Sequence, residues 1–247
     1  MKKFIRQIPN ILTLANLGLG CAAVSFILNN DLAMAALMIY IAAFLDFTDG
    51  AMARWLHAES ETGKQLDTLA DIVSFGLVPG LVFFKLISMA LSTGSNSFSV
   101  LSSWNLLGFL VTIAAAWRLA RFNLSESESK SFRGLATPAS ALLTVSLPLV
   151  LMSDEWGMRD IILNKYFLAG AVLLLSYLMV SSYRMFSLKF DGSSWQHNKV
   201  RYLFVLGAIG LTLISIFLIN IYVIVPCVVI FYIILSLINS LFRKTDT

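Results

Sequence analysis

The chain has 247 residues, of which 58% are hydrophobic and 13% are charged, and its mean hydropathy is +0.81. A soluble domain is about one-quarter charged, so this composition excludes an ordinary soluble enzyme or binding module. The formal net charge is +4 and the basic residues form no compact domain, which argues against nucleic-acid binding.

Apolar runs of about 20 residues recur along the chain, and this is the length that crosses a bilayer as a helix. We predict membrane spans at residues 11–29, 32–54, 65–90, 99–120, 135–152, 164–186, 201–219 and 221–241. The pattern therefore predicts an all-α polytopic membrane protein. Its fold is expected to be a helical bundle of about eight transmembrane helices, forming a single integral membrane domain over residues 1–247.

The first span opens with two polar residues, Asn10 and Thr13, directly after Pro9. Side chains of this kind can cap the start of a helix. They can equally donate hydrogen bonds to an anionic group at the same level, such as a diphosphate. Both interpretations remain open.

The second span ends with two acids and two small residues on one face. These are Asp46, Asp49, Gly50 and Ala53, at i, i+3, i+4 and i+7. At 3.6 residues per turn they share one side of a helix, and the small residues let a neighbouring helix or a bulky ligand come close. Arg54 lies about 80° round from Asp46 on an ideal helix. Its guanidinium either contacts a phosphate or extends to the membrane interface.

The third span begins with a matching face, because Gly63, Asp67 and Asp71 occur at i, i+4 and i+8. A short loop joins the two spans, so the acidic faces can meet. Four clustered carboxylates repel one another in a medium of low dielectric constant unless they are protonated or bind cations. Hard oxygen ligands suit Mg²⁺ or Mn²⁺, and four acids suffice for two ions of the kind that assist phosphoryl transfer. The alternative is four solvated acids at helix ends.

Two arginines, Arg118 and Arg121, end the fourth span, and Arg133 precedes the fifth. A guanidinium pairs with a carboxylate through parallel hydrogen bonds, so any of the three can bind a substrate that carries one. Alternatively, each anchors its helix at the membrane surface.

Positive charge is distributed unevenly over the predicted bundle. Fifteen of the 18 Lys and Arg residues fall on the side of the N-terminus, Arg159 and Lys165 fall on the opposite side, and Lys85 lies near that opposite side. The positive-inside rule therefore places both termini and region 46–71 in the cytoplasm. We expect the chain to lie in the cell (inner) membrane.

Region 46–71 resembles the signature of the CDP-alcohol phosphatidyltransferases, D-x2-D-G-x2-A-R-x8-G-x3-D-x3-D. The eight fixed positions are filled by Asp46, Asp49, Gly50, Ala53, Arg54, Gly63, Asp67 and Asp71. Four more segments resemble the serine-using branch of that family, the phosphatidylserine synthases: IPNILTLANLGLGCAAV, LDTLADIVSFGLVPG, WRLARFN and FRGLATPASA. The resemblance covers about residues 8–141.

The resemblance implies a six-helix catalytic core within residues 1–190 and additional helices in residues 191–247. It implies transfer of the phosphatidyl group of CDP-diacylglycerol to L-serine, which yields phosphatidylserine and CMP, with two Mg²⁺ or Mn²⁺ ions and a homodimer in the lipid bilayer. By this analogy the metals bind Asp46, Asp49, Asp67 and Asp71, and Asp71 also acts as general base.

The same analogy assigns the substrate contacts. CDP-diacylglycerol is expected to contact Asn10, Thr13, Gly50, Ala53, Arg54 and Gly63. Serine is expected to contact Arg118, Arg121 or Arg133.

Two other functions are compatible with these residues. The first is the same chemistry with glycerol 3-phosphate or an inositol phosphate as acceptor, although a dianionic acceptor calls for more clustered positive charge. The second is a cation-coupled transporter, since acids within a membrane are typical of ion pathways. Transporter sites lie near the bilayer midplane between repeated halves, whereas these acids lie towards one side and we find no internal repeat.

Overall fold

A computed structural model describes residues 7–92, 103–125, 134–154, 157–183, 185–186, 195–218 and 220–243, and every element in these ranges is helical. Five helical stretches are long and apolar enough to cross a membrane: Ile8–Leu28, Leu32–Trp55, Glu61–Ser92, Ser103–Leu124 and Ile221–Ser240. Three shorter apolar helices cover Thr137–Ser153, Lys165–Val180 and Val200–Ile216. These stretches correspond to the eight predicted spans, and the prediction of an all-α polytopic membrane protein is confirmed.

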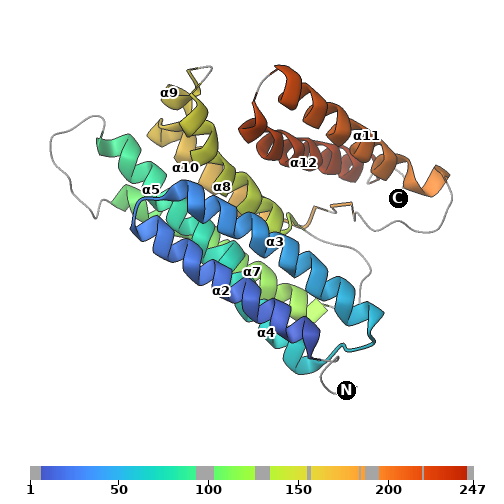
Figure 1. The fold of residues 1–247 in the computed structure, drawn as a ribbon. Helices are drawn as coiled ribbons and strands as arrows, with labels where there is room; N and C mark the ends of the chain where they lie inside the picture. The colour runs from blue at the N-terminus through green and yellow to red at the C-terminus, as the bar shows by residue number, and fades with distance from the viewer. Residues whose placement is uncertain are drawn as a thin grey trace.

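Helices α2 (Ile8–Leu28) and α3 (Leu32–Trp55) form an antiparallel hairpin along one side of the bundle (Figure 1). The side chain of Asp31 accepts a hydrogen bond from the Met34 amide at 3.0 Å and so caps the start of α3. Small residues such as Ala23 and Ala35 are fully buried. Small side chains allow two helices to pack closely, which explains how these two stay in contact along their lengths.

The third span is one long helix with a widened turn in its middle. It consists of α4 (Glu61–Asp71), the π-helical segment η1 (Ile72–Leu77) and α5 (Val78–Ser92). Pro79 has no N–H and its ring crowds the carbonyl one turn earlier, so a regular α-helical turn cannot form there. The Val78 amide instead bonds to the carbonyl of Val73, five residues back, and the Thr112 hydroxyl donates to the Gly76 carbonyl at 2.9 Å. The sequence predicted this span without its widened turn.

The fourth span consists of a short helix and a long one, α6 (Ser103–Leu106) and α7 (Phe109–Ser125). The break between them falls at Gly108, which touches the backbone of α5. A Cβ on Gly108 would lie 2.7 Å from the Phe84 nitrogen and 2.8 Å from the Gly80 oxygen. The predicted fourth span, 99–120, therefore corresponds to the helical stretch Ser103–Leu124, which has a turn at Gly108 where the backbone packs closely against α5.

Helices α8 (Thr137–Ser153), α9 (Met158–Ile162) and α10 (Lys165–Val180) follow. The predicted sixth span, 164–186, extends too far, because α10 ends at Val180 and Ser181 is extended. The chain then pairs with the segment before α8. The Gly134 amide donates to the Tyr183 carbonyl and the Leu135 amide donates to the Leu178 carbonyl, both at 2.9 Å.

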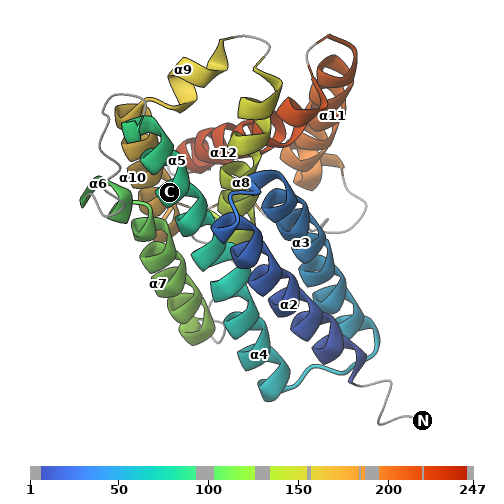
Figure 2. The same cartoon turned by 60° about the vertical axis from the view of Figure 1, so that its left-hand side comes forward.

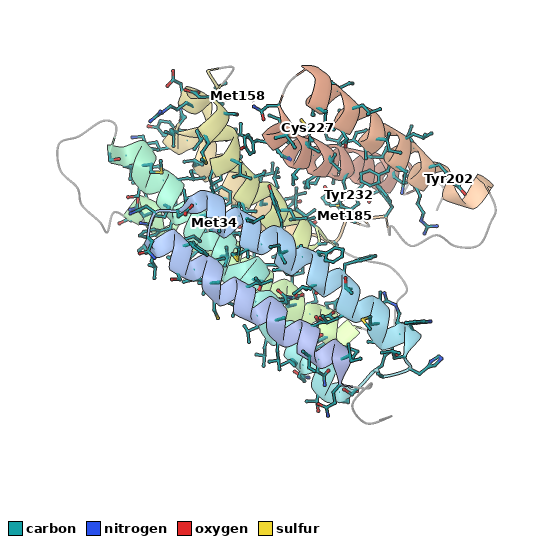
Figure 3. The ribbon with its side chains drawn as sticks, in the orientation of Figure 1. Met34, Met158, Met185, Tyr202, Cys227 and Tyr232 are labelled. Atoms are coloured by element: carbon teal, nitrogen blue, oxygen red, sulfur yellow. The ribbon has the colours of Figure 1, made fainter. Side chains whose placement is uncertain are left out.

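The C-terminal helices form a second hairpin at one side of the bundle (Figures 1 and 2), made of α11 (Trp195–Leu218), the 3₁₀ turn η2 (Ile221–Val223) and α12 (Ile224–Arg243). Val229 and Ile233 of α12 are buried in the common core. The Tyr232 hydroxyl donates to the Phe186 carbonyl at 3.2 Å, and Figure 3 shows Tyr232 beside Met185 at this boundary. The hairpin is thus docked on the rest of the bundle.

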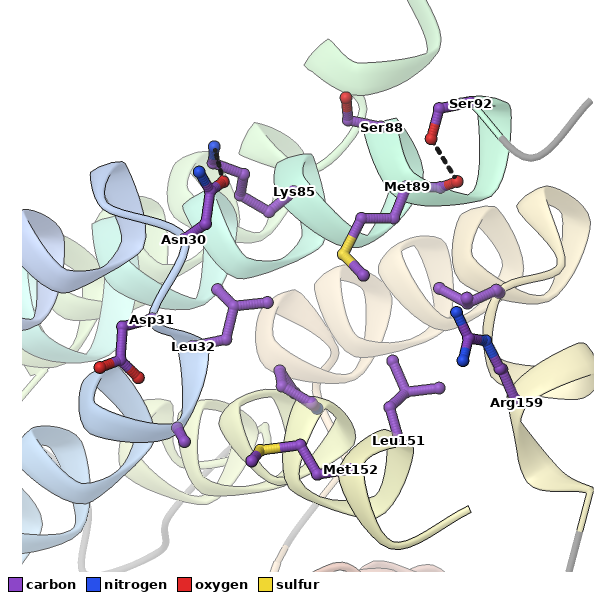
Figure 4. A pocket seen from close by; sticks show the side chains of 13 residues that line it. Asn30, Asp31, Leu32, Lys85, Ser88, Met89, Ser92, Leu151, Met152 and Arg159 are labelled. Atoms are coloured by element: carbon purple, nitrogen blue, oxygen red, sulfur yellow. Dashed lines mark hydrogen bonds between the residues drawn. The ribbon is translucent and has the colours of Figure 1, made fainter. Parts of the chain in front are cut away.

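A cavity of about 630 Å³ lies at the end of the bundle where α2 turns into α3 (Figure 4). Asn30, Lys85 and Arg159 are among its lining residues, and the Lys85 ammonium donates to the Asn30 side-chain oxygen at 2.8 Å. At a rise of 1.5 Å per residue, Asn30 is about 25 Å along α2 from Thr13. This cavity is therefore remote from the acidic residues at the other end.

Candidate active site

The C-terminal part of α3 and the whole of α4 bring acidic side chains together. One carboxylate oxygen from each of Asp46, Asp49 and Asp67 lies within 4.8 Å of the other two. The expected meeting of the two acidic faces is therefore found. Hard oxygen donors at this spacing suit a divalent cation such as Mg²⁺ or Mn²⁺.

Asp71 lies deeper, at the junction between α4 and the π-helical segment. It is 8% exposed, and its carboxyl is in electrostatic contact with Asp46, Asp67 and Asp49. Its Oδ1 atom is buried without a hydrogen-bond partner. A buried anionic oxygen without a donor is costly, so this atom is ready to accept a proton or to bind a cation.

The start of α2 lies beside this acidic group. The Thr13 hydroxyl donates to Asp49 Oδ2 at 2.6 Å, and both side chains are buried. The side-chain oxygen of Asn10 lies 2.9 Å from the position that a Cβ on Gly63 would occupy. Gly63 thus lets the Asn10 amide approach α4 at the level of the acids.

Arg54 turns back along α3 rather than away from the site. A Cβ on Gly50 would lie 3.5 Å from one terminal nitrogen of Arg54, so the guanidinium covers the glycine one turn earlier. Arg54 is exposed, whereas Gly50 and Ala53 are half-buried. The small residues therefore leave room beside the acids, and an exposed cation borders that room.

The three candidate serine-binding arginines have different surroundings. Arg118 is only 9% exposed and donates to the Thr137 hydroxyl at 3.3 Å, while its Nε atom is buried without a partner. Its positive charge interacts electrostatically with Asp71. Arg121 donates to the Val180 carbonyl at 3.2 Å, at the end of α10. Arg133 lies outside the described residues. Of the two arginines that the structure describes, Arg118 is thus the one that interacts with the acidic group.

Three further polar residues border this region and were not singled out from the sequence. Asn16 is fully buried one turn beyond Thr13. Asn123 donates to the Thr68 hydroxyl at 2.8 Å and links α7 to α4. Tyr232 of α12 interacts electrostatically with Arg118. Asn16 could have been found, because Asn10, Thr13 and Asn16 recur every third residue in an otherwise apolar span.

This arrangement combines a group of carboxylates that could hold a divalent cation with nearby positively charged side chains. The carboxylates can hold metal ions against an anionic group, and Arg54 can contact the same group from the rim. Two metal ions about 4 Å apart commonly assist displacement at phosphorus. The geometry therefore suits phosphoryl transfer to an acceptor near Asp71 and Arg118.

Comparison with known proteins decides the family. The sequence model of the CDP-alcohol phosphatidyltransferase family matches residues 6–180, which is more than half of the chain and includes all four aspartates. The chain belongs to the CDP-alcohol phosphatidyltransferase family. The resemblance found in region 46–71 is thereby confirmed, and α11 and α12 lie beyond the part of the chain that the family model matches.

Similar proteins from several bacteria are named CDP-diacylglycerol–serine O-phosphatidyltransferase. That of Bacillus subtilis is 33% identical over 178 residues, covering 72% of this chain and 88% of the relative. That of Helicobacter pylori (strain J99) is 32% identical over 178 residues, covering 71% of this chain and 70% of the relative. An archaetidylserine synthase of Methanothermobacter thermautotrophicus is 26% identical over 174 residues, covering 68% and 67% respectively.

Proposed function

We propose that this protein transfers the phosphatidyl group of CDP-diacylglycerol to the hydroxyl of L-serine, yielding phosphatidylserine and CMP. The observation that carries the proposal is the meeting of the acidic faces of α3 and α4, which brings Asp46, Asp49 and Asp67 within 4.8 Å. The relatives named for transfer to serine support the choice of acceptor.

Asp46, Asp49, Asp67 and Asp71 would hold two divalent ions, Mg²⁺ or Mn²⁺. Bound there, the ions supply positive charge that neutralises the diphosphate and the departing CMP. Thr13 holds Asp49 in place through its 2.6 Å hydrogen bond. The protein thus supplies a group of carboxylates whose orientation is set before the substrate arrives.

CDP-diacylglycerol would bind at the start of α2 and the end of α3. The small residues Gly50, Ala53 and Gly63 leave space for the nucleotide. Asn10 and Thr13 lie at the same level as the acids, and Arg54 can pair with phosphate from the rim.

The acceptor would lie between Asp71 and Arg118. Arg118 is buried and has an unpartnered Nε atom, so it can pair with the serine carboxylate better than Arg121, whose guanidinium holds the Val180 carbonyl. As the serine Oγ bonds to phosphorus, the bond from that phosphorus to the CMP oxygen breaks and the hydroxyl proton passes to Asp71. Arg133 would contribute positive charge at the same membrane face.

The molecule would function as a homodimer in the cell (inner) membrane, with both termini and the active site on the cytoplasmic side. The distribution of Lys and Arg residues supports this orientation. The catalytic core would lie within residues 1–190, and the match of the family model to residues 6–180 supports that boundary.

The deciding experiment supplies the purified protein with CDP-diacylglycerol and one alcohol at a time. We expect CMP release with L-serine and none above background with glycerol 3-phosphate or an inositol phosphate. Release only with one of the phosphorylated alcohols would overturn the choice of serine and leave the reaction type intact. Cation flux in proteoliposomes without CMP release under any condition would favour a transporter.

A further inference from the structure

The side chain of Asn16 is buried in the middle of the bundle without any hydrogen bond. Its exposed fraction is 0%, and neither its amide nitrogen nor its amide oxygen has a partner. Buried polar groups in folded proteins nearly always have partners, so an exception calls for an explanation such as a bound ligand.

The packing of α2 against α3 shows which residues of α3 lie opposite Asn16. The two helices are antiparallel (Figure 1), and Thr13 bonds to Asp49. Moving three residues forward on α2 corresponds to moving three residues back on α3. Asn16 is therefore at the level of Asp46.

The packing of α2 against α4 and η1 also places Asn16 close to the acidic residues. These helices run in parallel (Figure 2), with Asn10 against Gly63 near their starts. Further along, the Ser74 hydroxyl donates to the main-chain carbonyl of Asn16 at 3.1 Å. Ser74 lies one turn beyond Asp71, so Asn16 is beside the deep end of the acidic group.

Three groups in this region thus have buried polar atoms without partners: both ends of the Asn16 amide, Oδ1 of Asp71 and Nε of Arg118. An amide needs an acceptor for its NH₂ group and a donor for its oxygen. A phosphate offers only acceptors, and a metal-bound water offers only donors. A zwitterionic amino acid offers a carboxylate and an ammonium group together.

We propose that Asn16 binds the amino-acid part of the acceptor and is a specificity-determining residue. Its NH₂ group donates to the acceptor carboxylate and its oxygen accepts from the acceptor ammonium. Arg118 binds the same carboxylate, and the acceptor hydroxyl faces Asp71. The inference rests on the proposed function, because it requires an amino acid as acceptor.

The test is Asn16→Leu in the full-length protein, which keeps the side-chain volume and removes both polar ends. We expect the KM for L-serine to rise about tenfold or more, since hydrogen bonds to two charged groups are lost. The KM for CDP-diacylglycerol should stay within about twofold of the wild-type value. The thermal midpoint should be unchanged or higher, because the variant removes a buried amide that lacks partners.

Asn105→Leu serves as the control, since Asn105 is another buried amide and lies in α6, at the other end of the bundle from α4 (Figure 2). We expect this variant to keep both KM values. Asn16→Ala serves as a second variant in case leucine prevents folding. An unchanged serine KM in a folded Asn16 variant would overturn the proposal, as would a loss of folding in both variants, which would indicate a structural role.

The wild-type assay separates this proposal from the proposed function. If the wild-type protein releases CMP with serine and the Asn16 variants do so with the same serine KM, only the role of Asn16 is wrong. If the wild-type protein does not use serine at all, the proposed function is wrong and the role of Asn16 is wrong with it.

Discussion

The four aspartates lie at different depths, although their spacing in the sequence is similar. Asp49 is 5% exposed and Asp71 is 8% exposed, whereas Asp46 and Asp67 are half-buried. Asp49 has a donor in Thr13, while Oδ1 of Asp71 has none. A buried carboxylate oxygen without a donor is stable only when a proton or a ligand satisfies it. Asp71 is therefore the aspartate that depends most on what binds in the site.

Asp67→Asn keeps the side-chain shape and removes one negative charge from the acidic group. We expect kcat to fall by about a hundredfold or more, because several kcal/mol of charge stabilisation are lost and each ~1.4 kcal/mol is a factor of ten. CMP release in detergent micelles measures this. Glu59→Gln, which changes an exposed acid in the loop before α4, should keep wild-type activity. Wild-type turnover in Asp67→Asn would show that this carboxylate holds no essential ion.

Removal of divalent ions tests the acidic group as a whole. We expect EDTA to stop CMP release and an excess of Mg²⁺ or Mn²⁺ to restore it, because carboxylates that bind no cation repel one another and the anionic substrate. Addition of a monovalent salt at equal ionic strength is the control and should not restore activity. Undiminished turnover in the chelator would exclude a catalytic divalent ion.

At the scale of the helices, α2 packs closely against the π-helical segment η1 because Gly20 of α2 has no side chain at the point of contact. A Cβ on Gly20 would lie 2.5 Å from the Ser74 hydroxyl oxygen and 3.2 Å from both the Ser74 Cα and nitrogen atoms. The backbone atoms cannot move away as a side chain can. The same helix carries Thr13 and Asn16, so its distance from η1 determines how close these two residues lie to the candidate active site.

Gly20→Ala should therefore destabilise the bundle by about 1–3 kcal/mol, the usual cost of an added group in a tightly packed interior. Gly18→Ala is the matched control, since it lies in the same helix and a Cβ there would meet nothing within 4 Å. Thermal unfolding in detergent compares the two variants. Equal thermal midpoints would contradict close packing of α2 on η1.

In the whole molecule, the acidic group and the cavity near Asn30 lie at opposite ends of helices about 30 Å long, close to the thickness of a bilayer core. The orientation of the bundle is predicted from charge, and labelling of single cysteines can test it. With Cys21 and Cys227 replaced by alanine, an impermeant maleimide should label Asp160→Cys in intact cells. It should label Glu59→Cys only after the membrane is opened. The reverse pattern would place the acids outside the cytoplasm.

The sequence by itself determined the class of protein and the location of its acids. Twenty-residue apolar runs identified the spans, because the length needed to cross a bilayer is a local property. The spacing of Asp46 and Asp49, and of Asp67 and Asp71, placed each pair on one helix face, because the period of 3.6 residues is also local. The same region carried the family signature that the comparison confirmed.

Only the tertiary structure decided which polar side chains meet. Arg118 and Arg121 end the same helix, yet Arg118 is buried and interacts electrostatically with Asp71, whereas Arg121 donates a hydrogen bond to the carbonyl at the end of α10. Asn16 lies in an apolar span, and its side chain lacks a hydrogen-bond partner because α3 and η1 enclose it in the folded protein. The sequence does not show this enclosure. The break at Gly108 likewise depends on contact with α5. Such contacts join residues far apart in the chain, so neither hydropathy nor helical periodicity along the sequence can reveal them.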